Sequence, residues 1–480
     1  MSENANTTRT PSKPDDPMRS FSEDTDMKRD LGLLEAVSIV VNRIIGSGIF
    51  RTPAPIMAYV ASTSLFGLVW ALGGIVTIFG AVIYAELAAM MPRSGGPYEY
   101  LKMSYGPFWA FLRGWAMFFV SETASITAVA LIFAEYLSAA WFLVNGVHLD
   151  KMVIFAVAFA TIWLLTMINL WGVQFSGWVQ NIFSFVKIAA VGSIIGIAFT
   201  SWSTGNWANF ITPLFPESFG GTTILAVGAA LRYAFFAFSG WEGATYIAEE
   251  VKNPRRNLPL SLFIGIGGVM LLYLGANAAY LFQLPPERIA EAPWVATEVM
   301  TVAMGATGGI LISIAVMINT FGNVNTQILC KARTWQAMAR DGVFFDWFAK
   351  LHPTYRTPNN ALLGQAGWAT VLLVFAVLAD NSYETMIDFF SATSTIFNIL
   401  VFTSIWVLRR KYPDAHRPYR AWLYPWSLVG ILAIYFAFLV ITLITAFVPS
   451  IIGLGLTATG AVYYFFKVGF GRRPVGASAD

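Results

Sequence analysis

Charged residues are scarce in this sequence. Asp, Glu, Lys and Arg account for 12% of its 480 residues, and 56% of the residues are hydrophobic. A typical soluble domain has about 25% charged residues. A chain long enough for about three soluble domains therefore lacks the charge to cover their surfaces. This composition excludes a soluble enzyme and indicates a membrane protein whose outer surface contacts the lipid bilayer. The net charge of +3 is too small to indicate a nucleic-acid partner.

Cysteine and histidine are also rare. Cys330 is the single cysteine, which excludes an intrachain disulfide. The histidines His148, His352 and His416 lie apart in polar stretches, whereas a metal cage needs several ligands close together. We expect neither a metal site nor a cofactor. The alternative of a membrane-embedded enzyme lacks a nucleophile–base pair within the apolar runs. Without a P-loop motif, primary pumping is not expected.

Long apolar runs are abundant. A hydrocarbon core about 30 Å thick needs about 20 apolar residues per helix, and the runs lack the alternation of a β-barrel. We therefore predict an all-α, polytopic membrane protein with twelve transmembrane helices. Polar residues 1–30 are interpreted as a disordered tail, and residues 468–480 as a second tail. The predicted spans cover residues 33–58, 64–90, 107–141, 152–171, 175–201, 222–249, 259–283, 302–330, 360–379, 386–408, 422–447 and 449–467.

Positive charge is concentrated on one side of these spans. With twelve spans both termini lie on the same side, and the tails and loops of that side contain 24 of the 30 Lys and Arg residues. Loops on the other side contain only Lys151 and Arg288. Because cytoplasmic loops retain positive charge, both termini are expected in the cytoplasm. The expected location is the plasma membrane, and specifically a bacterial inner membrane.

Small residues interrupt two of the spans. The first span contains Gly46, Ser47 and Gly48, and the sixth contains Ser239 and Gly240. Such residues either form a packing face between helices or break a helix where it lines a cavity. Two broken spans, each the first of five, indicate an inverted-repeat transporter. Half-helix N-termini attract an anion and carbonyl ends attract a cation, a combination that suits a zwitterionic amino acid.

Several motifs resemble those of the amino acid–polyamine–organocation superfamily, closest to its L-type amino-acid transporters. The matching segments are 44–50 (IIGSGIF), 84–87, 91–98, 179–183 with Lys187, 249–250, 253–259, 338–342 and 417–420. The resemblance implies a 5+5 inverted repeat with two additional C-terminal helices. The first repeat would cover residues 31–201, the second repeat residues 222–408, and the two additional helices residues 422–467.

The resemblance also implies a substrate site. The carboxylate of an amino acid would bind the backbone amides around Ser47 and Gly48. Its amine would meet carbonyls near Ile44 and in the break of the sixth span, and Phe236 would be an aromatic gate. Ser239 replaces the glycine of many L-type members, which narrows the space for a substrate side chain. The implied substrate-binding residues are Ile44, Gly46, Ser47, Gly48, Phe236, Ala237, Ser239 and Gly240.

Lys187 and Glu242 are the predicted coupling residues. An ionisable side chain near the middle of a span is costly and usually faces a functional interior; the alternative for Lys187 is a lysine that snorkels to the interface. As an ammonium group, Lys187 would replace a bound cation between the fifth and first spans. As a neutral amine, it would release a proton during transport. Related transporters carry a lysine there, and the wider superfamily often has glutamate at the position of Glu242.

Other polar residues lie within the third and eighth spans. Glu122 and Glu135 are expected to pair with Arg43 or Arg232 in structural or gating ion pairs. The asparagines of the eighth span either line a cavity or bond only to neighbouring helices; they are Asn319, Asn323 and Asn325.

These features together predict a secondary active transporter that works by alternating access and exchanges small or medium neutral L-amino acids. The alternatives are a proton-coupled amino-acid symporter and a cationic amino-acid or polyamine antiporter. Animal L-type transporters pair with a heavy chain through a loop cysteine after the third span. The corresponding loop, 142–151, has no cysteine, so no disulfide-linked heavy chain is expected.

Overall fold

The computed structural model describes residues 21–23, 29–171, 177–216, 219–355, 357–378 and 382–469. Within these ranges the chain is helical apart from turns and loops, and its single β-bridge joins Leu31 to Val251. Helices satisfy their own backbone hydrogen bonds, which a chain crossing lipid requires. The all-α prediction is confirmed. The two predicted tails lie mostly outside the described residues.

Eleven helical segments are long and apolar enough to cross a membrane. The remaining predicted span, 175–201, coincides with α9 (Gly177–Thr200), whose described side chains begin at Phe185. The first four spans are α1 (Leu33–Ile44) with α2 (Gly48–Arg51) and α3 (Pro53–Val60); α4 (Thr63–Met90); α6 (Pro107–Ala116) with η2 (Met117–Ser121) and α7 (Glu122–Asn145); and α8 (Lys151–Leu170).

Among the later spans, the sixth is also broken. The later spans are α10 (Gly221–Ala237) with η4 (Trp241–Glu250), α11 (Pro254–Gln283), α13 (Val295–Arg340), α14 (Asn359–Leu378), α15 (Ser382–Lys411), α16 (Trp426–Thr445) and α17 (Phe447–Val468). Short helices in the connections are α5 (Pro97–Tyr105), η3 (Trp207–Phe210), α12 (Pro286–Glu291) and η5 (Asp346–Ala349).

Several helices exceed their predicted limits, among them those of the third and eighth spans. The third span is helical over Pro107–Asn145, with a π-helical turn at Met117–Ser121. The eighth lies in α13, a 46-residue helix that is kinked at Gly305, where φ is 72°. The limit 141 stops one turn early within an apolar stretch that continues to Asn145, and the limit 330 is too short because the more polar residues 331–340 continue α13.

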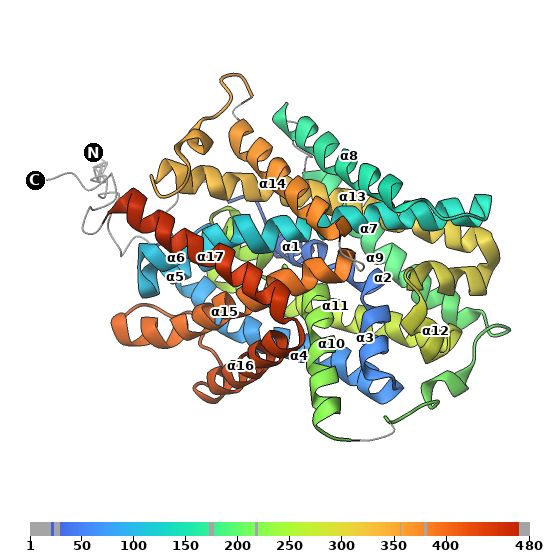
Figure 1. Ribbon diagram of the computed structural model, residues 1–480. Coiled ribbons are helices and arrows are strands. Elements are labelled where there is room, and N and C mark those ends of the chain that lie inside the picture. Colours follow the sequence, from blue (N-terminus) through green and yellow to red (C-terminus); the bar gives the residue numbers. More distant parts are fainter. Residues whose placement is uncertain are drawn as a thin grey trace, which may run out of the picture.

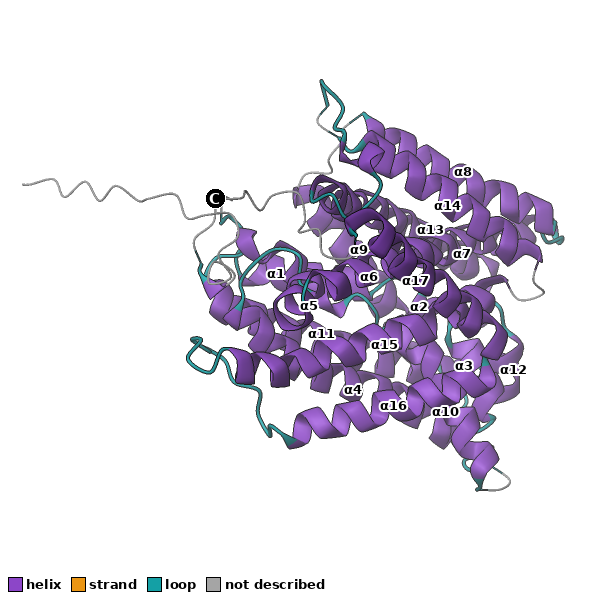
Figure 2. Cartoon of the chain, turned by 60° about the vertical axis from the view of Figure 1, so that its left-hand side comes forward, coloured by secondary structure: helices purple, strands orange, loops and turns teal. Residues whose placement is uncertain are grey.

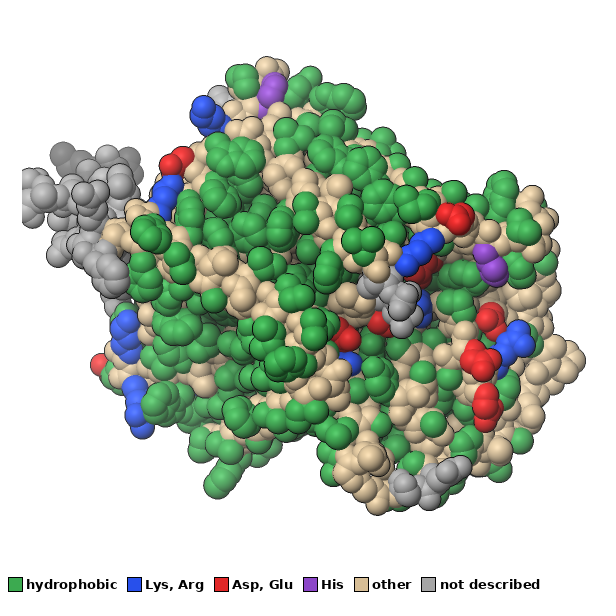
Figure 3. Space-filling view, viewed as in Figure 1, with side chains coloured by type: hydrophobic (Ala, Val, Ile, Leu, Met, Phe, Trp, Pro, Cys, Tyr) green, Lys and Arg blue, Asp and Glu red, His purple; other side chains and the backbone are tan. Residues whose placement is uncertain are grey.

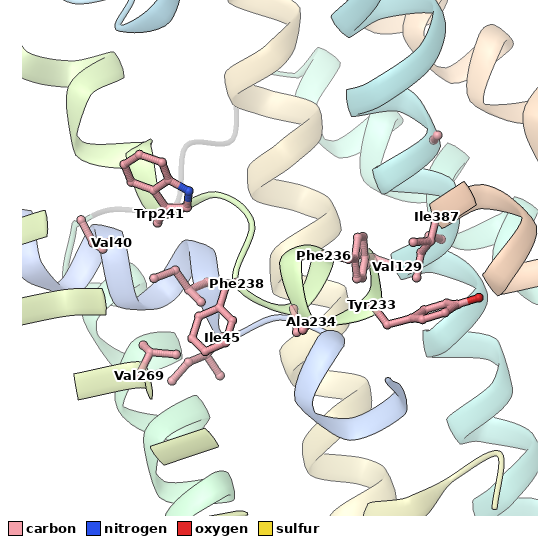
Figure 4. Packing of buried hydrophobic residues seen from close by; sticks show 14 of the residues in the cluster. Val40, Ile45, Val129, Tyr233, Ala234, Phe236, Phe238, Trp241, Val269 and Ile387 are labelled. Carbon is pink, nitrogen blue, oxygen red and sulfur yellow. The ribbon is translucent and has the colours of Figure 1, made fainter. Parts of the chain in front are cut away.

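The two predicted helix breaks are present and lie against each other. Residues 45–47 separate α1 from α2, and residues 238–240 separate α10 from η4. A Cβ atom on Gly48 would lie 2.5 Å from the Cα of Ala237, so only glycine allows this contact. Gly240 has a φ of 87°, in the left-handed region that favours glycine. Figure 4 shows the chain on both sides of the breaks, near Ile45 and Phe238.

The spans pack in two groups. In one group α4 packs against α11, which also contacts α1; in the other, α7 packs against α13, α8 and α14. Helices α16 and α17 lie outside these groups, against α15 (Figures 1 and 2). Figure 3 shows a broad hydrophobic face with charged side chains mostly toward its edges. This arrangement suits a protein surrounded by lipid, and it leaves the two helix breaks in the interior.

Candidate substrate-binding site

A cavity lies at the two helix breaks. Its volume, measured as the space open to the centres of water-sized molecules, is about 170 Å³, and one water needs only about 10–15 Å³ on that measure. The cavity therefore has room for a small solute. All eight residues predicted to bind substrate line it, as do Lys187 and Glu242; the eight are Ile44, Gly46, Ser47, Gly48, Phe236, Ala237, Ser239 and Gly240.

Ser47 is placed at the start of α2, where the first N–H groups of a helix have no acceptor within that helix. The side chain is 2% exposed, and within the described part of the chain its hydroxyl meets no partner at hydrogen-bond geometry. Hydroxyl and amide donors thus share one point on the cavity wall. This is a local environment that can receive a carboxylate.

The carbonyls of the breaks are partly occupied by a residue that the sequence analysis missed. The Tyr273 hydroxyl, from α11, lies 3.0 Å from the Ile44 carbonyl oxygen and 3.2 Å from that of Ala237. The Ile44 oxygen also accepts from the Gly46 N–H at 2.7 Å, which uses both of its lone pairs, whereas the Ala237 oxygen keeps one for a second donor. Tyr273 therefore connects both broken helices through one hydroxyl group. A buried tyrosine usually finds such a partner, but the sequence does not reveal which one.

Lys187 is buried rather than directed to an interface. Its side chain is 2% exposed, and its Nζ donates to the Asn42 carbonyl oxygen at 3.0 Å. This bond connects α9 to the end of α1, next to the first break. The snorkelling alternative is therefore wrong for Lys187.

Phe236 lies on the cavity wall within an aromatic cluster. It is 7% exposed, and its ring lies 5.8 Å from that of Tyr383 and 5.7 Å from that of Phe390. Figure 4 shows Val129, from α7, beside the same ring. The gate position implied by the family resemblance is thus filled by an aromatic cluster.

Ion pairs lie behind Phe236, on the side away from the start of α1 and the end of α17. Arg51 is 2.9 Å from Glu384 and 3.3 Å from Glu135, and Arg232 is 2.9 Å from Asp388. These pairs join α2 and α10 to α7 and α15. A second cavity of about 500 Å³ begins beyond them. On this side, called here the far side, the ion pairs separate the two cavities.

The predicted partners of the buried carboxylates are wrong. Glu135 pairs with Arg51, and Glu122 pairs with Lys331 at 2.8 Å, rather than with Arg43 or Arg232. The physical reason is helix packing: Lys331 lies on α13, which packs closely against α7. Sequence patterns do not show which helices are neighbours.

The asparagines of α13 divide between the two predicted roles. Asn319 donates to the Gly46 carbonyl oxygen at 3.4 Å, and Asn323 lines the cavity. Asn325 instead accepts a hydrogen bond from Asn169 of α8 at 2.7 Å. The first two asparagines therefore support the break in the first span, whereas Asn325 connects two helices.

A polytopic helical protein with an interior cavity between two broken helices belongs to the class of secondary transporters for small solutes. The sequence matches the family described as "Amino acid permease" over residues 31–470. The chain belongs to this family, and its activity is the transport of amino acids rather than catalysis.

Individual relatives are similar along most of their length. The serine/threonine exchanger SteT of Bacillus subtilis is 31% identical over 455 residues, which are 93% of this chain and 98% of SteT. The large neutral amino acids transporter small subunit 2 of Homo sapiens is 31% identical over 93% of this chain and 82% of its own. The Asc-type amino acid transporter 1 of Mus musculus is 29% identical over 94% of this chain and 84% of its own.

Proposed function

We propose that this permease exchanges small or medium neutral L-amino acids across the plasma membrane by alternating access. The observation that carries the proposal is the meeting of Gly46–Gly48 and Phe236–Gly240 around one cavity. The relatives with 31% identity include a protein named as an exchanger, which supports exchange over one-way transport.

The two breaks offer complementary groups to a zwitterion. The amides and hydroxyl at Ser47 and Gly48 would bind the carboxylate. The free lone pair of the Ala237 carbonyl would accept a hydrogen bond from the amine, near the Ile44 carbonyl and beside the Tyr273 hydroxyl. Phe236 would cover the bound amino acid on the far side.

The charges around the cavity favour a neutral substrate over a cationic amino acid or polyamine. Arg43 and Arg113 line the cavity, and the described residues give neither of them an ion pair. The carboxylate of Glu122, also on the wall, is compensated by Lys331. The carboxylate of Glu242 also lines the cavity, but the cations Arg43, Arg113 and Lys187 outnumber it, so a cationic side chain would be repelled.

Proton-coupled symport is the second candidate, and Lys187 is the observation that favours it. The buried lysine donates a hydrogen bond to the Asn42 carbonyl. Its ammonium group thus occupies a position where a bound cation could connect α9 to α1. Proton release from Lys187, with Glu242 as a second titratable group on the wall, would change that connection during transport.

Alternating access would move the two broken helices against the group formed by α7, α8, α13 and α14. The ion pairs of Arg51 and Arg232 would have to open for substrate to enter from the far side. Both termini would lie in the cytoplasm, in a bacterial inner membrane. No disulfide-linked heavy chain is proposed, because the loop at 142–151 lacks cysteine.

The test is uptake by proteoliposomes that contain the full-length protein. Radiolabelled serine, alanine and leucine would be offered to vesicles with and without internal amino acid, at two pH values. Exchange predicts uptake only into preloaded vesicles, with little dependence on a pH gradient. Uptake into empty vesicles driven by a proton gradient would support symport instead, and absence of amino-acid uptake would refute the proposed function.

A further inference from the structure

One wall of the cavity carries a largely polar stripe at the end of η2 and the start of α7. Ser121, Glu122, Ser125 and Val129 all line the cavity, and their spacing places them on one face of the helix. Both serines are partly exposed, whereas Thr123 is buried. Neither serine hydroxyl makes a hydrogen bond with any described residue, so both are free toward the cavity.

A second stripe lies on α15, which packs against α7. Ser391, Ser394, Thr395 and Asn398 line the same cavity, at the spacing of one helix face. The Ser391 and Thr395 hydroxyls donate to carbonyls of their own helix at 2.6 and 2.7 Å. Ser394 and Asn398 are partly exposed and have no hydrogen-bond partner among the described residues.

We propose that these two stripes form a subsite for a substrate side chain that itself forms hydrogen bonds, namely a hydroxyl or a carboxamide. The inference rests on the proposed function, since it concerns the side chain of an amino acid held at Ser47 and Gly48. Ser125, Ser394 and Asn398 are the specificity-determining residues. They offer two hydroxyl groups and one amide, which can donate to or accept from such a side chain.

The selectivity of this subsite would come from hydrogen bonds that an alkyl side chain cannot make. When an alkyl side chain fills the space between the stripes, it displaces water from these polar groups and gives them no partner in return. A site that bonds a substrate hydroxyl can therefore reject the analogue that lacks it strongly, whereas an apolar pocket cannot. The carboxylate of Glu122 does not make this wall attract a cationic side chain, because Lys331 lies 2.8 Å away and compensates its charge.

Size sets the upper limit of the side chain. The cavity offers about 170 Å³ to water-sized molecules, and Phe236 lies on its wall. Ser239 adds a side chain at the second break. Serine, threonine and asparagine have small side chains with the hydrogen-bonding groups that this subsite would take.

The experiment compares amino acids of nearly equal shape. Threonine and valine, serine and alanine, and asparagine and leucine would compete with radiolabelled serine for entry into proteoliposomes containing the full-length protein. We expect the hydrogen-bonding member of each pair to compete at least tenfold better. Equal competition within the pairs would overturn this inference and leave the proposed function intact. Failure of every amino acid to enter would overturn the proposed function itself.

Variants then test the residues. Ser394→Ala and Asn398→Leu should each reduce the preference for threonine over valine at least fivefold, by raising KM for threonine and leaving KM for valine unchanged or lower. The matched control is Ser404→Ala on the same helix: this hydroxyl bonds to the Leu400 carbonyl and lies away from the cavity. Retained valine uptake shows that a variant is folded. A threonine preference that survives in both folded variants would overturn the assignment of the subsite.

Discussion

At the scale of single residues, Tyr273 connects the two broken helices. Its one hydroxyl reaches the backbone of both broken helices, at the carbonyls of Ile44 and Ala237. These carbonyls belong to the segments that the proposed alternating access would move. The tyrosine therefore determines how the two breaks stand relative to each other in the described state.

Tyr273→Phe should impair transport without unfolding the protein. The change removes the shared donor and leaves two buried carbonyls less satisfied, at a cost of about 1–3 kcal/mol. We expect a several-fold lower turnover in exchange and a lower melting temperature in detergent. Tyr412→Phe is the control, because the Tyr412 ring lies on the Phe21 ring and away from the cavity. Equal exchange rates for the two variants would contradict the role of Tyr273.

Substitutions of Lys187 should separate charge from shape. Lys187→Arg retains a cation that can reach the Asn42 carbonyl, whereas Lys187→Ala removes both the charge and the bond of 3.0 Å. We expect turnover to fall more in the alanine variant than in the arginine variant. Initial rates of exchange in proteoliposomes measure the difference. If both variants transport like the parent protein, Lys187 is not a coupling residue.

Sequence reasoning succeeded for residues whose type is unusual for their place. Small residues in mid-span located both breaks, and a lysine in an apolar run indicated an interior role. It failed for residues whose partner is distant in the chain. Arg51 and Glu384 are separated by more than 300 positions, and no local pattern shows that they meet. Tyr273 was missed because a tyrosine in a span is not unusual.

At the scale of helices, the contact between the two breaks depends on glycine. The backbone of Ala237 lies where a side chain on Gly48 would begin, with only 2.5 Å between the Cα atom and an added Cβ. The two broken helices can approach this closely only because Gly48 has no side chain.

Gly48→Ala should therefore separate the breaks and abolish transport. An added Cβ must push the backbone of α2 away from α10, which changes the spacing of the groups around the cavity. The matched control is Gly196→Ala on α9, where an added Cβ meets nothing within 4 Å. This control should keep full transport and gain up to about 1 kcal/mol of stability from better helix propensity. Full serine exchange by Gly48→Ala would show that the close contact is not required.

The far-side ion pairs connect the moving helices to the other group. Arg51→Gln removes the cation shared by Glu135 and Glu384, so the far side should open more often. With Cys330→Ser as background and Val129→Cys on the cavity wall, labelling by a membrane-impermeant thiol reagent from the far side should rise several-fold. Arg288→Gln is the control, since that residue has an exposed ion pair with Glu298. Unchanged labelling would argue against closure by Arg51.

At the scale of the whole molecule, the number and type of the spans followed from the sequence because lipid leaves few choices. A chain in hydrocarbon must satisfy its backbone within each helix, so long apolar runs become helices. The limits of the helices did not follow, as α13 shows, because a helix continues into water without an apolar sequence. The packing of α7 against α13 and α15 was also beyond local patterns, and it determines the ion pairs and the cavity wall.

The orientation of the whole molecule in the membrane is also a prediction from the sequence. The sequence assigns 24 of the 30 Lys and Arg residues to the tails, loops and adjoining span ends on the side of the termini, although the structure places Arg113 and Lys331 in the interior; positively charged loops remain in the cytoplasm. In a Cys330→Ser background, Asp414→Cys would report on that side and Val147→Cys on the far side; both positions are exposed. In intact cells an impermeant maleimide should label Val147→Cys only, and Asp414→Cys should react after the membrane is permeabilised. The reverse pattern would mean that the positive side faces outward, and that the ion pairs behind Phe236 close the cytoplasmic entrance instead of the external one.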